Sequence, residues 1–186
     1  GISLALLLRA QQPWNILLIE AQELASSDGP VSGAYSSSFD ARSTALSWSS
    51  KNIYQSIGLW PQLKKHLSAI AQIHVSDRGH VGMTRIDAGD ANVDALGYVV
   101  ENQWLGSVLL NQLTKTDIQL LGSCKLETIE PLASGMRLQL QQADKDLQTI
   151  ETKLLVIADG AGSTTAQQLG IQSQSTPYDQ TGIIAN

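Results

Sequence analysis

The sequence is poor in cysteine, in basic residues and in long apolar runs. Cys124 is the only cysteine among 186 residues, which excludes an internal disulfide and a cysteine-based metal site. Lys and Arg number 12 against 17 carboxylates, without a basic stripe and interleaved aromatics, so a nucleic-acid partner is not expected. No apolar run reaches the roughly 18 residues that a membrane-spanning helix needs. The apolar residues 2–8 also lack the basic flank and the cleavage site of a secretory signal. These absences predict a soluble protein in a reducing cytoplasm, or one at most peripheral to a membrane.

The most informative stretch is residues 153–170, KLLVIADGAGSTTAQQLG. Its first residues are apolar and predict a strand, buried on both faces, that ends at Asp159. Gly160 allows a tight turn, Ser163 is a good N-cap for the helix that follows, and Gly170 can close that helix. A carboxylate at the carboxyl end of a buried strand lies where open α/β sheets bind nucleotides. The residues alone also fit an ordinary strand–turn–helix in which Asp159 accepts hydrogen bonds from loose backbone amides.

The beginning of the chain has the order of the second half of a dinucleotide-binding unit. Residues 1–10 predict a buried helix, and residues 15–20, NILLIE, predict a short buried strand. Glu20 falls about 20 residues beyond the glycine turn, where Rossmann folds place the acid that binds the ribose. Gly1 would then be the third glycine of G-x-G-x-x-G, and we expect the chain to be a fragment that begins inside this fingerprint. An ordinary apolar helix followed by a strand is the alternative.

Arg42 follows a Ser- and Gly-rich segment, residues 21–38, that predicts a loop. It directly precedes a predicted helix, capped by Ser43 or Thr44, that runs to about residue 57. An Arg at such a junction can anchor a phosphate or a carboxylate. A surface pair with Asp40 or Glu20 is the alternative.

The middle of the chain predicts a hairpin and a strand–helix unit. In residues 69–82, AIAQIHVSDRGHVG, apolar residues predict strands and SDRG predicts a turn. His74, Asp77 and His80 are poor evidence for a metal site, because no third His or Cys lies nearby in the sequence. Residues 96–101 predict a strand, and Asn102 can cap a helix over residues 103–113.

A β-meander is predicted after that helix. Residues 118–121 and 125–130 predict strands, and residues 136–141 alternate between apolar and polar side chains. A turn at residues 144–146 leads into a return strand, residues 147–157, that runs directly into Asp159. Residues 178–186 end on GIIAN, the apolar start of a strand, and the C-terminus also has the character of a truncation.

Several of these stretches resemble one enzyme family. Ala158-Asp159-Gly160-x-x-Ser163 resembles the second FAD motif of the aromatic-ring flavoprotein monooxygenases, the para-hydroxybenzoate hydroxylase-like family. That family commonly has an Arg three residues after the Ser, where this chain has Ala166. The D-x-R-x-x-A-L pattern of residues 40–46 is similar to the family's flavin-contacting Arg segment. IHVSDRGHVG is close to a stretch of the ubiquinone-biosynthesis hydroxylases within the family.

The resemblance implies an α/β fold with several parts. These are a Rossmann-like FAD-binding domain with a parallel sheet, an antiparallel β-meander and part of a β-sheet substrate domain. Residues 1–68 would form the first part of the FAD-binding domain and residues 69–101 part of the substrate-domain sheet. Residues 102–176 would return to the FAD-binding domain with its meander. Residues 177–186 would begin a truncated return into the substrate domain.

The resemblance also implies an activity and a cofactor. The reaction would be FAD-dependent hydroxylation of the aromatic ring of a prenylated phenol in ubiquinone biosynthesis, with NAD(P)H as reductant and O2. The flavin carries this chemistry, so no catalytic side chain is assigned. We expect the isolated chain to be inactive, and we leave open a peripheral contact with the inner membrane or with a ubiquinone-biosynthesis complex. The implied cofactor-binding residues are Gly1, Glu20, Arg42, Asn102, Leu126, Asp159 and Gly160.

Two other functions remain open at this point. One is another FAD-dependent oxidoreductase of the same fold, such as a reductase or a halogenase. The other is a non-enzymatic dinucleotide-binding domain that uses Glu20 for NAD.

Overall fold

The computed structural model describes residues 1–23, 42–143, 145–160, 163–172, 174, 176–179 and 181. The chain forms two compact units. The meander unit comprises Gly1 and the described residues of Asn15–Ser26 and Ile118–Asn186. The helical unit comprises Ile2–Trp14 and the described residues of Ser27–Asp117. Most of the loop predicted over residues 21–38, and the strand start predicted at residues 182–186, lie outside the described residues.

A parallel pair of strands begins the meander unit. β1 (Leu17–Ile19) pairs in parallel with β7 (Gln119–Leu121), and Leu18 lies opposite Leu120. The ladder continues past β1, because the Glu20 N–H donates to the Leu121 carbonyl oxygen at 2.8 Å. The strand predicted over residues 15–20 is therefore confirmed, although its residues are half-buried rather than buried. Only one edge of β1 has a partner among the described strands, which leaves its side chains partly covered.

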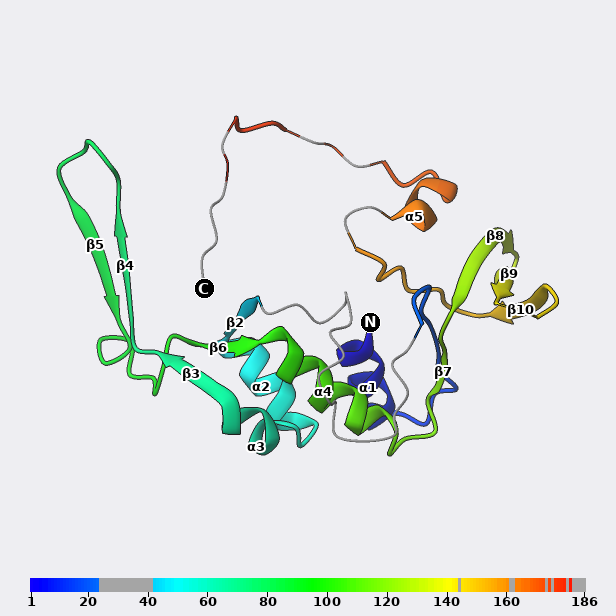
Figure 1. The fold of residues 1–186 in the computed structure, drawn as a ribbon, viewed down its shortest axis with the longest axis horizontal. Coiled ribbons are helices and arrows are strands. Elements are labelled where there is room, and N and C mark those ends of the chain that lie inside the picture. The colour runs from blue at the N-terminus through cyan, green and yellow to red at the C-terminus, as the bar shows by residue number, and fades with distance from the viewer. Residues whose placement is uncertain are drawn as a thin grey trace. The chain divides into compact units, whose positions relative to one another are not determined.

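The predicted β-meander is confirmed. β8 (Cys124–Leu132), β9 (Gly135–Gln142) and β10 (Gln148–Thr152) form an antiparallel sheet with β9 in the centre (Figure 1). The core of this unit is Cys124, Leu138 and Leu140, each at most 2% exposed. Half-buried apolar residues pack around it: Leu17, Ile19, Leu121, Leu126, Ile129, Met136, Ile150 and Leu155. The sheet thus takes its stability from the inward-facing side chains of its central strand.

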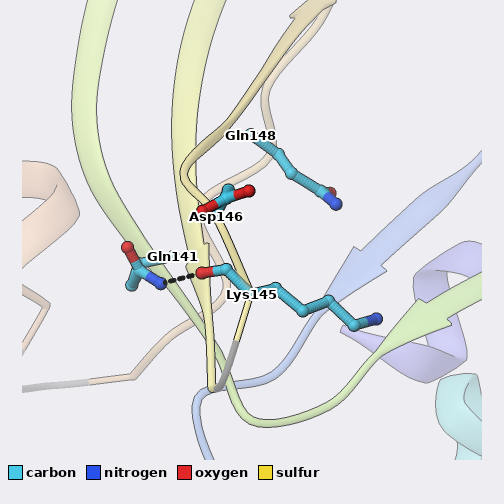
Figure 2. A pocket seen from close by; sticks show the side chains of 4 residues that line it. All are labelled: Gln141, Lys145, Asp146 and Gln148. Atoms are coloured by element: carbon cyan, nitrogen blue, oxygen red, sulfur yellow. Dashed lines mark hydrogen bonds between the residues drawn. The ribbon is translucent and has the colours of Figure 1, made fainter.

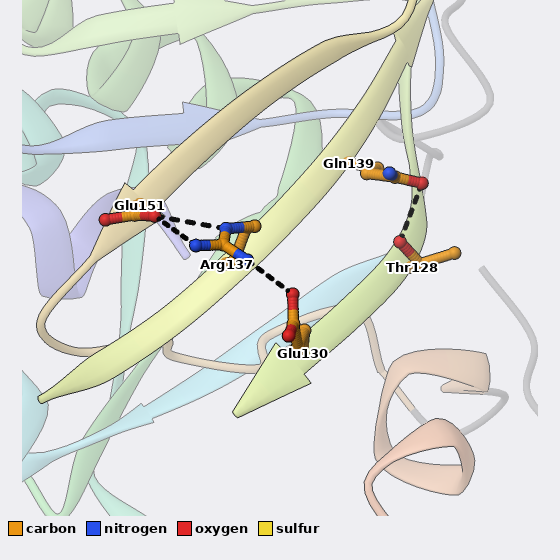
Figure 3. Close-up of polar contacts among 5 residues, drawn as sticks. All are labelled: Thr128, Glu130, Arg137, Gln139 and Glu151. Atoms are coloured by element: carbon orange, nitrogen blue, oxygen red, sulfur yellow. Dashed lines mark hydrogen bonds and ion pairs between the residues drawn. The ribbon is translucent and has the colours of Figure 1, made fainter. Parts of the chain in front are cut away.

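Arg137 of β9 joins all three strands of the meander (Figure 3). Its Nε and Nη2 donate to Glu151 Oε1 of β10 at 3.0 and 2.9 Å, and its Nη1 donates to Glu130 Oε2 of β8 at 2.8 Å. Both carboxylates lie directly opposite Arg137 in the strand register. Exposed ion pairs stabilise little individually. A planar guanidinium shared by both neighbouring strands nevertheless favours this register over a slipped one.

The strand predicted to run from the meander into Asp159 is wrong. β10 ends at Thr152, and no described strand pairs with residues 154–158. These residues alternate instead. Leu155 and Ile157 are half-buried and Leu155 packs on the meander core, whereas Leu154 is 72% and Val156 is 48% exposed. Apolar composition predicted burial on both faces, but a strand also needs a partner for its backbone groups.

The helical unit contains α1 (Ile2–Gln11), α2 (Trp48–Ser56), α3 (Trp60–Leu63) and α4 (Asn102–Leu113). A short 3-10 turn, η1 (Lys64–His66), directly follows α3. Two contacts hold α1 in this unit. Arg9 makes a bidentate pair with Asp117, and the Ser3 and Tyr54 hydroxyls lie 3.0 Å apart. Among the described residues, no helix is both long and apolar enough to cross a bilayer.

This unit also contains an antiparallel sheet, and one of its strands was predicted as helix. β6 (Gly97–Glu101) is central between β2 (Ser43–Ser47) and β3 (Leu67–Ile70). The helix predicted from Ser43 or Thr44 is therefore wrong over its first five residues, which form β2. The helix α2 starts only after Ser47, whose hydroxyl accepts the Ser50 N–H at 3.2 Å. Pairing with β6 and burial of Leu46 outweigh the polar composition of this segment.

Lys51 anchors α2 to the sheet. Its Nζ lies 4.0 Å from the centroid of the Trp48 ring and 5.6 Å from that of Tyr98 of β6. Trp60 is 5.9 Å away on a third side, and Asp94 Oδ2 lies at 3.8 Å. Only 12% of the Lys51 side chain is exposed, so its cation–π contacts are partly desolvated and stronger than surface ones.

The predicted hairpin is confirmed as β4 (Gln72–Ser76) and β5 (Met83–Asp87). Ile73 lies opposite Ile86 and Val75 opposite Thr84, so these side chains share one face. Figure 1 shows the hairpin extending away from the helices of its own unit. All its residues except Asp87 are exposed.

Two Leu→Ala substitutions should test the core of the meander unit. Leu138→Ala should lower the free energy of unfolding by about 2–5 kcal/mol, because it leaves a cavity in a tightly packed site. Leu154→Ala removes the same atoms from an exposed side chain and should change stability by less than about 0.5 kcal/mol. Urea unfolding of both variants provides the measurement. Equal losses would mean that residues 154–158 form the buried strand after all.

Candidate functional site

The Asp159-Gly160 turn lies just before α5 (Thr164–Gln168) in the meander unit. Gly160 has φ +85°, and among the described residues no atom lies within 4 Å of the position that a Cβ would take. This left-handed backbone conformation itself favours glycine.

Asp159 is part of this turn's own hydrogen bonding. Hydrogen bonds from the Ser163 side chain, and further ones from Thr165, hold the pKa of Asp159 below its usual value. These donors stabilise the ionised carboxylate, and its exposure leaves it accessible from solvent. Asp159 therefore accepts hydrogen bonds from within its own turn and helix start, as the alternative interpretation expected. The donors are Ser163 and Thr165.

The predicted caps of the helix α5 are confirmed. The Ser163 Oγ accepts the Ala166 N–H at 3.0 Å. At the other end, Gly170 has φ +69° and its N–H donates to the Gln167 carbonyl oxygen, while the Ile171 N–H donates to that of Ala166. This pair of bonds is a Schellman motif, which closes the helix.

Gly1 lies near the segment that leads into this turn. A Cβ built at Gly1 would be 4.0 Å from the Cβ of Ala158, the residue before Asp159. The structure thus places the glycine predicted at a dinucleotide fingerprint near the residue that precedes the predicted cofactor-binding carboxylate. These two predictions came from opposite ends of the sequence.

Glu20 and Leu126 occupy other places in the meander unit. Glu20 follows β1, is half-buried, and its Oε1 accepts the Gln22 N–H at 3.0 Å, which orients the carboxylate. Leu126 lies opposite Leu140 and packs on the meander core, beside a bulge between Leu126 and Thr128. The Leu126 side chain therefore stabilises the sheet, and only its backbone is suited to a polar ligand.

Arg42 and Asn102 come together in the helical unit, although 60 positions separate their numbers in the sequence. The Asn102 N–H donates to the Arg42 carbonyl oxygen at 3.0 Å, one step beyond the last β2–β6 pair, Ser43 and Glu101. Two predictions about their settings are wrong. Arg42 precedes the strand β2 rather than a helix, and Asn102 is the first residue of α4, whose N-cap is Glu101. The strand continues to Glu101, which moves the helix start one residue along.

Thr44 is a residue of this second group that the sequence analysis missed. Its hydroxyl donates to Asn102 Oδ1 at 2.5 Å. The available signal was the spacing of two from Arg42, which places both side chains on one face of a strand. That signal was hidden because residues 43–47 were predicted as helix.

The remaining sequence candidates and hollows carry no site residues. His80 Nδ1 pairs with Asp77 Oδ2 at 2.8 Å, and the described part of the chain contains no group of three metal-ligating side chains. A hollow of about 670 Å³ at the β9–β10 turn is lined by Gln141, Lys145, Asp146 and Gln148 (Figure 2). There the Gln141 Nε2 donates to the Lys145 carbonyl oxygen at 2.7 Å, so these side chains hold their own turn together.

Substitution of Asp159 should reveal how much its carboxylate contributes to the stability of the folded protein. Because its pKa is lowered on folding, its contribution is present above the usual Asp pKa of about 3.9 and is lost as pH falls through the folded value. Asp159→Ala should therefore lower the melting temperature of the cofactor-free protein at pH 7, and the loss should shrink as the pH falls below the usual Asp pKa. Asp146→Ala, at the β9–β10 turn, is the matched control. A loss for Asp159→Ala that stays the same as the pH falls would contradict a role for the carboxylate charge.

No protein-family model matches the chain. Comparison with curated proteins does find relatives. Slr1300, an uncharacterized protein of Synechocystis, is 30% identical over 140 residues, which are 75% of this chain and 34% of that protein. The ubiquinone hydroxylase UbiL of Rhodospirillum rubrum is 28% identical over 147 residues, 78% of this chain and 33% of UbiL. The human ubiquinone biosynthesis monooxygenase COQ6 is 29% identical over 181 residues, 91% of this chain and 36% of COQ6. The chain spans about a third of the length of each of these relatives.

Solved structures share the fold. The flavin-dependent monooxygenase PieE, determined with FAD and substrate, has a TM-score of 0.70 at 17% identity and covers 91% of this chain and 30% of PieE. The anhydrotetracycline hydroxylase OxyS of Streptomyces rimosus has a TM-score of 0.71 at 16% identity over 91% of this chain and 31% of OxyS. The predicted α/β fold and the resemblance read from the motifs are both confirmed. The chain is a relative of the ubiquinone-biosynthesis hydroxylases and has the fold of the FAD-dependent aromatic monooxygenases.

Proposed function

We propose that the protein is an FAD-dependent monooxygenase that hydroxylates the aromatic ring of a prenylated phenol in ubiquinone biosynthesis. The names of its sequence relatives and the fold of its structural neighbours support this reaction class. The observation within the chain that carries the proposal is the closeness of Gly1 to Ala158, because a Cβ built at Gly1 would lie 4.0 Å from the Ala158 Cβ. Gly1 and the residue before Asp159, which belong to two predicted nucleotide-binding motifs, are thus near each other.

The residues of the turn fit a dinucleotide. Glycine at position 160 has no side chain, which would let a ligand approach the backbone closely, and the Asp159 carboxylate is held ionised to accept ribose or ribitol hydroxyl donors. Glu20 is oriented by Gln22 and half-buried, which suits the acid that binds an adenosine ribose. When bound, FAD would supply the activation of O2. The protein's side chains would then need to bind the cofactor, orient the substrate and exclude water, rather than to attack the substrate.

Arg42 and Asn102 are proposed as further FAD contacts, each on the surface of the helical unit. A guanidinium offers five N–H donors and a permanent charge to phosphate or to flavin oxygens. Asn102 begins α4 beside it, so its side-chain amide is held on a rigid element. NAD(P)H is proposed as the reductant, with Ala166 in the place of the Arg that such motifs commonly have.

The domain boundaries and partners belong to the same proposal. Residues 1–68 and 102–176 would serve the FAD-binding domain, with residues 69–101 in the substrate-domain sheet and residues 177–186 returning to it. The segment IHVSDRGHVG resembles a stretch of the ubiquinone-biosynthesis hydroxylases, in particular the octaprenyl-methoxyphenol hydroxylase, and this resemblance supports a prenylated substrate. A peripheral contact with a membrane or with a biosynthetic complex is proposed because such substrates are apolar.

Product analysis of the full-length protein tests the function. The purified protein should be yellow with bound flavin and should convert a prenylated phenol to its ring-hydroxylated product with NAD(P)H and O2. A yellow protein that reduces or halogenates its substrate would assign another reaction to the same fold. A colourless protein that takes up no FAD would reject the flavoenzyme altogether.

Arg42→Ala should weaken FAD binding by the full-length protein roughly tenfold to a hundredfold. Loss of one charge-assisted contact, about 1.5–3 kcal/mol, accounts for that range. Flavin fluorescence titration gives the dissociation constant. The loss of FAD affinity should exceed the accompanying loss in melting temperature of the cofactor-free protein.

Arg78→Ala, in the β4–β5 turn, is the matched control and should leave FAD affinity as it was. If Arg42→Ala instead destabilises the cofactor-free protein and leaves affinity intact, Arg42 is a structural ion-pair residue.

A further inference from the structure

The corner that follows β1 is joined to the corner between β7 and β8 by backbone hydrogen bonds. The Cys124 N–H donates to the Glu20 carbonyl oxygen at 3.0 Å, and the Ser123 N–H donates to the Gln22 carbonyl oxygen at 2.9 Å. The Glu20 N–H donates in return to the Leu121 carbonyl oxygen at 2.8 Å. These residues all lie in the meander unit. Both backbone polar groups of Glu20 are thus bonded to the β7–β8 corner.

Ser123 is the residue at which the backbone of the β7–β8 corner turns. Its φ is +50°, in the left-handed region, which is unfavourable for a residue with a side chain. In an extended chain consecutive N–H groups point to opposite sides, whereas around a left-handed residue they can converge on one segment. The N–H groups of Ser123 and Cys124 converge in this way on residues 20–22. The left-handed conformation therefore lets both bonds form.

Hydrogen bonds on the other side of this corner keep Ser123 in its conformation. The Ser123 carbonyl oxygen accepts the Ala143 N–H at 3.0 Å, just beyond the end of β9. The Gln142 Nε2 donates to the Gly122 carbonyl oxygen at 3.3 Å. The next residue, Cys124, belongs to the core of the meander unit. An unfavourable φ persists only where its surroundings determine it, and such residues gather at functional sites.

The Glu20 carboxylate depends on the position of this corner. Its Oε1 accepts the Gln22 N–H at 3.0 Å, and Gln22 is the residue whose carbonyl oxygen accepts the Ser123 N–H. A carboxylate can accept about four hydrogen bonds, so the bond from Gln22 orients it and leaves capacity to accept ribose hydroxyls. A corner that moved would carry the carboxylate with it.

We propose that Ser123 is a positioning residue for the adenosine ribose of FAD: its left-handed backbone lets the β7–β8 corner hold residues 20–22, and with them the Glu20 carboxylate, in place. The inference rests on the proposed function, since it takes Glu20 as the acid that binds the ribose. It deepens that function by adding a residue that acts only through Glu20.

The test compares Ser123→Val with Ser123→Asn in the full-length protein. Both substitutions remove the hydroxyl, but a β-branched residue disfavours a positive φ, whereas Asn tolerates it. In a flavin fluorescence titration Ser123→Val should weaken FAD binding about tenfold, the equivalent of one charge-assisted hydrogen bond. Ser123→Asn should bind FAD within about twofold of the parent. If Ser123→Val did not fold, Ser123→Ala, with its smaller side chain, would provide the same comparison.

A second readout examines the ribose itself. ADP and 2′-deoxy-ADP should displace FAD from the parent with affinities that differ about tenfold, because a Glu at this position binds the ribose 2′-hydroxyl. Ser123→Val should reduce this preference to about twofold or less, and Ser123→Asn should keep it. In a Glu20→Ala background, Ser123→Val should have no further effect on FAD affinity, because the group that it positions is gone.

Asn92→Val is the matched control. Asn92 also has a positive φ, +52°, but it lies in the helical unit, in the connection between β5 and β6. The substitution introduces the same unfavourable backbone conformation and should lower the melting temperature, while FAD affinity and the preference for ADP stay as in the parent.

The outcomes separate the inference from the proposed function. A Ser123→Val variant that keeps the parent's preference for ADP overturns the positioning role, even if it binds FAD more weakly, and leaves the flavoenzyme intact. A further loss in the Glu20→Ala background also overturns it, because Ser123 would then act by another route. A parent that binds FAD without distinguishing ADP from 2′-deoxy-ADP overturns the inference alone. A parent that takes up no FAD overturns both.

Discussion

The hydrogen bond from the Asn102 N–H to the Arg42 carbonyl oxygen extends the β2–β6 ladder to the point where two proposed cofactor contacts meet. Other contacts in the helical unit surround this ladder. Lys51 holds α2 against Tyr98 of β6 through its aromatic neighbours, and the Trp104 Nε1 of α4 donates to the Leu63 carbonyl oxygen of α3 at 3.2 Å. Arg42 and Asn102 are neighbours because each directly flanks one of two paired strands, β2 and β6.

The same requirement for pairing explains which elements could be predicted from the sequence. The meander was predicted correctly, because its alternating strands are joined by short turns and find partners next to them in the chain. Residues 43–47 and 154–158 were predicted wrongly for opposite reasons. The first segment is polar but pairs with β6, and the second is apolar but has no strand beside it among the described residues. A single sequence contains composition and period, whereas the partner of a strand is set by contacts distant in the chain.

The residues of the candidate site also divide into those that local sequence patterns predict and those that they do not. Asp159, Gly160 and Gly1 could be named in advance, because a glycine turn and a carboxylate at a segment end are local patterns with a physical reason. The contact of Thr44 with Asn102 could not, since it depends on the pairing of Thr44 with Val100 of β6, a register that no local pattern reveals. The start of α4 was predicted one residue too late, at residue 103 instead of Asn102. A capping Asn and a first helical Asn differ only in where the preceding strand ends.

At Asp159, the structural role and the proposed ligand-binding role need not compete. The helix α5 has five residues and is too short to be stable by propensity, so it depends on its caps and on the hydrogen bonds that Asp159 accepts from Ser163 and Thr165. Those donors keep the carboxylate ionised and in place before a ligand arrives, which lowers the ordering cost of binding. Removing the side chain would therefore disturb both roles. Asp159→Asn keeps the size and one accepting oxygen while it removes the charge, so it is the variant that distinguishes a ligand's need for the negative charge from the turn's need for an acceptor.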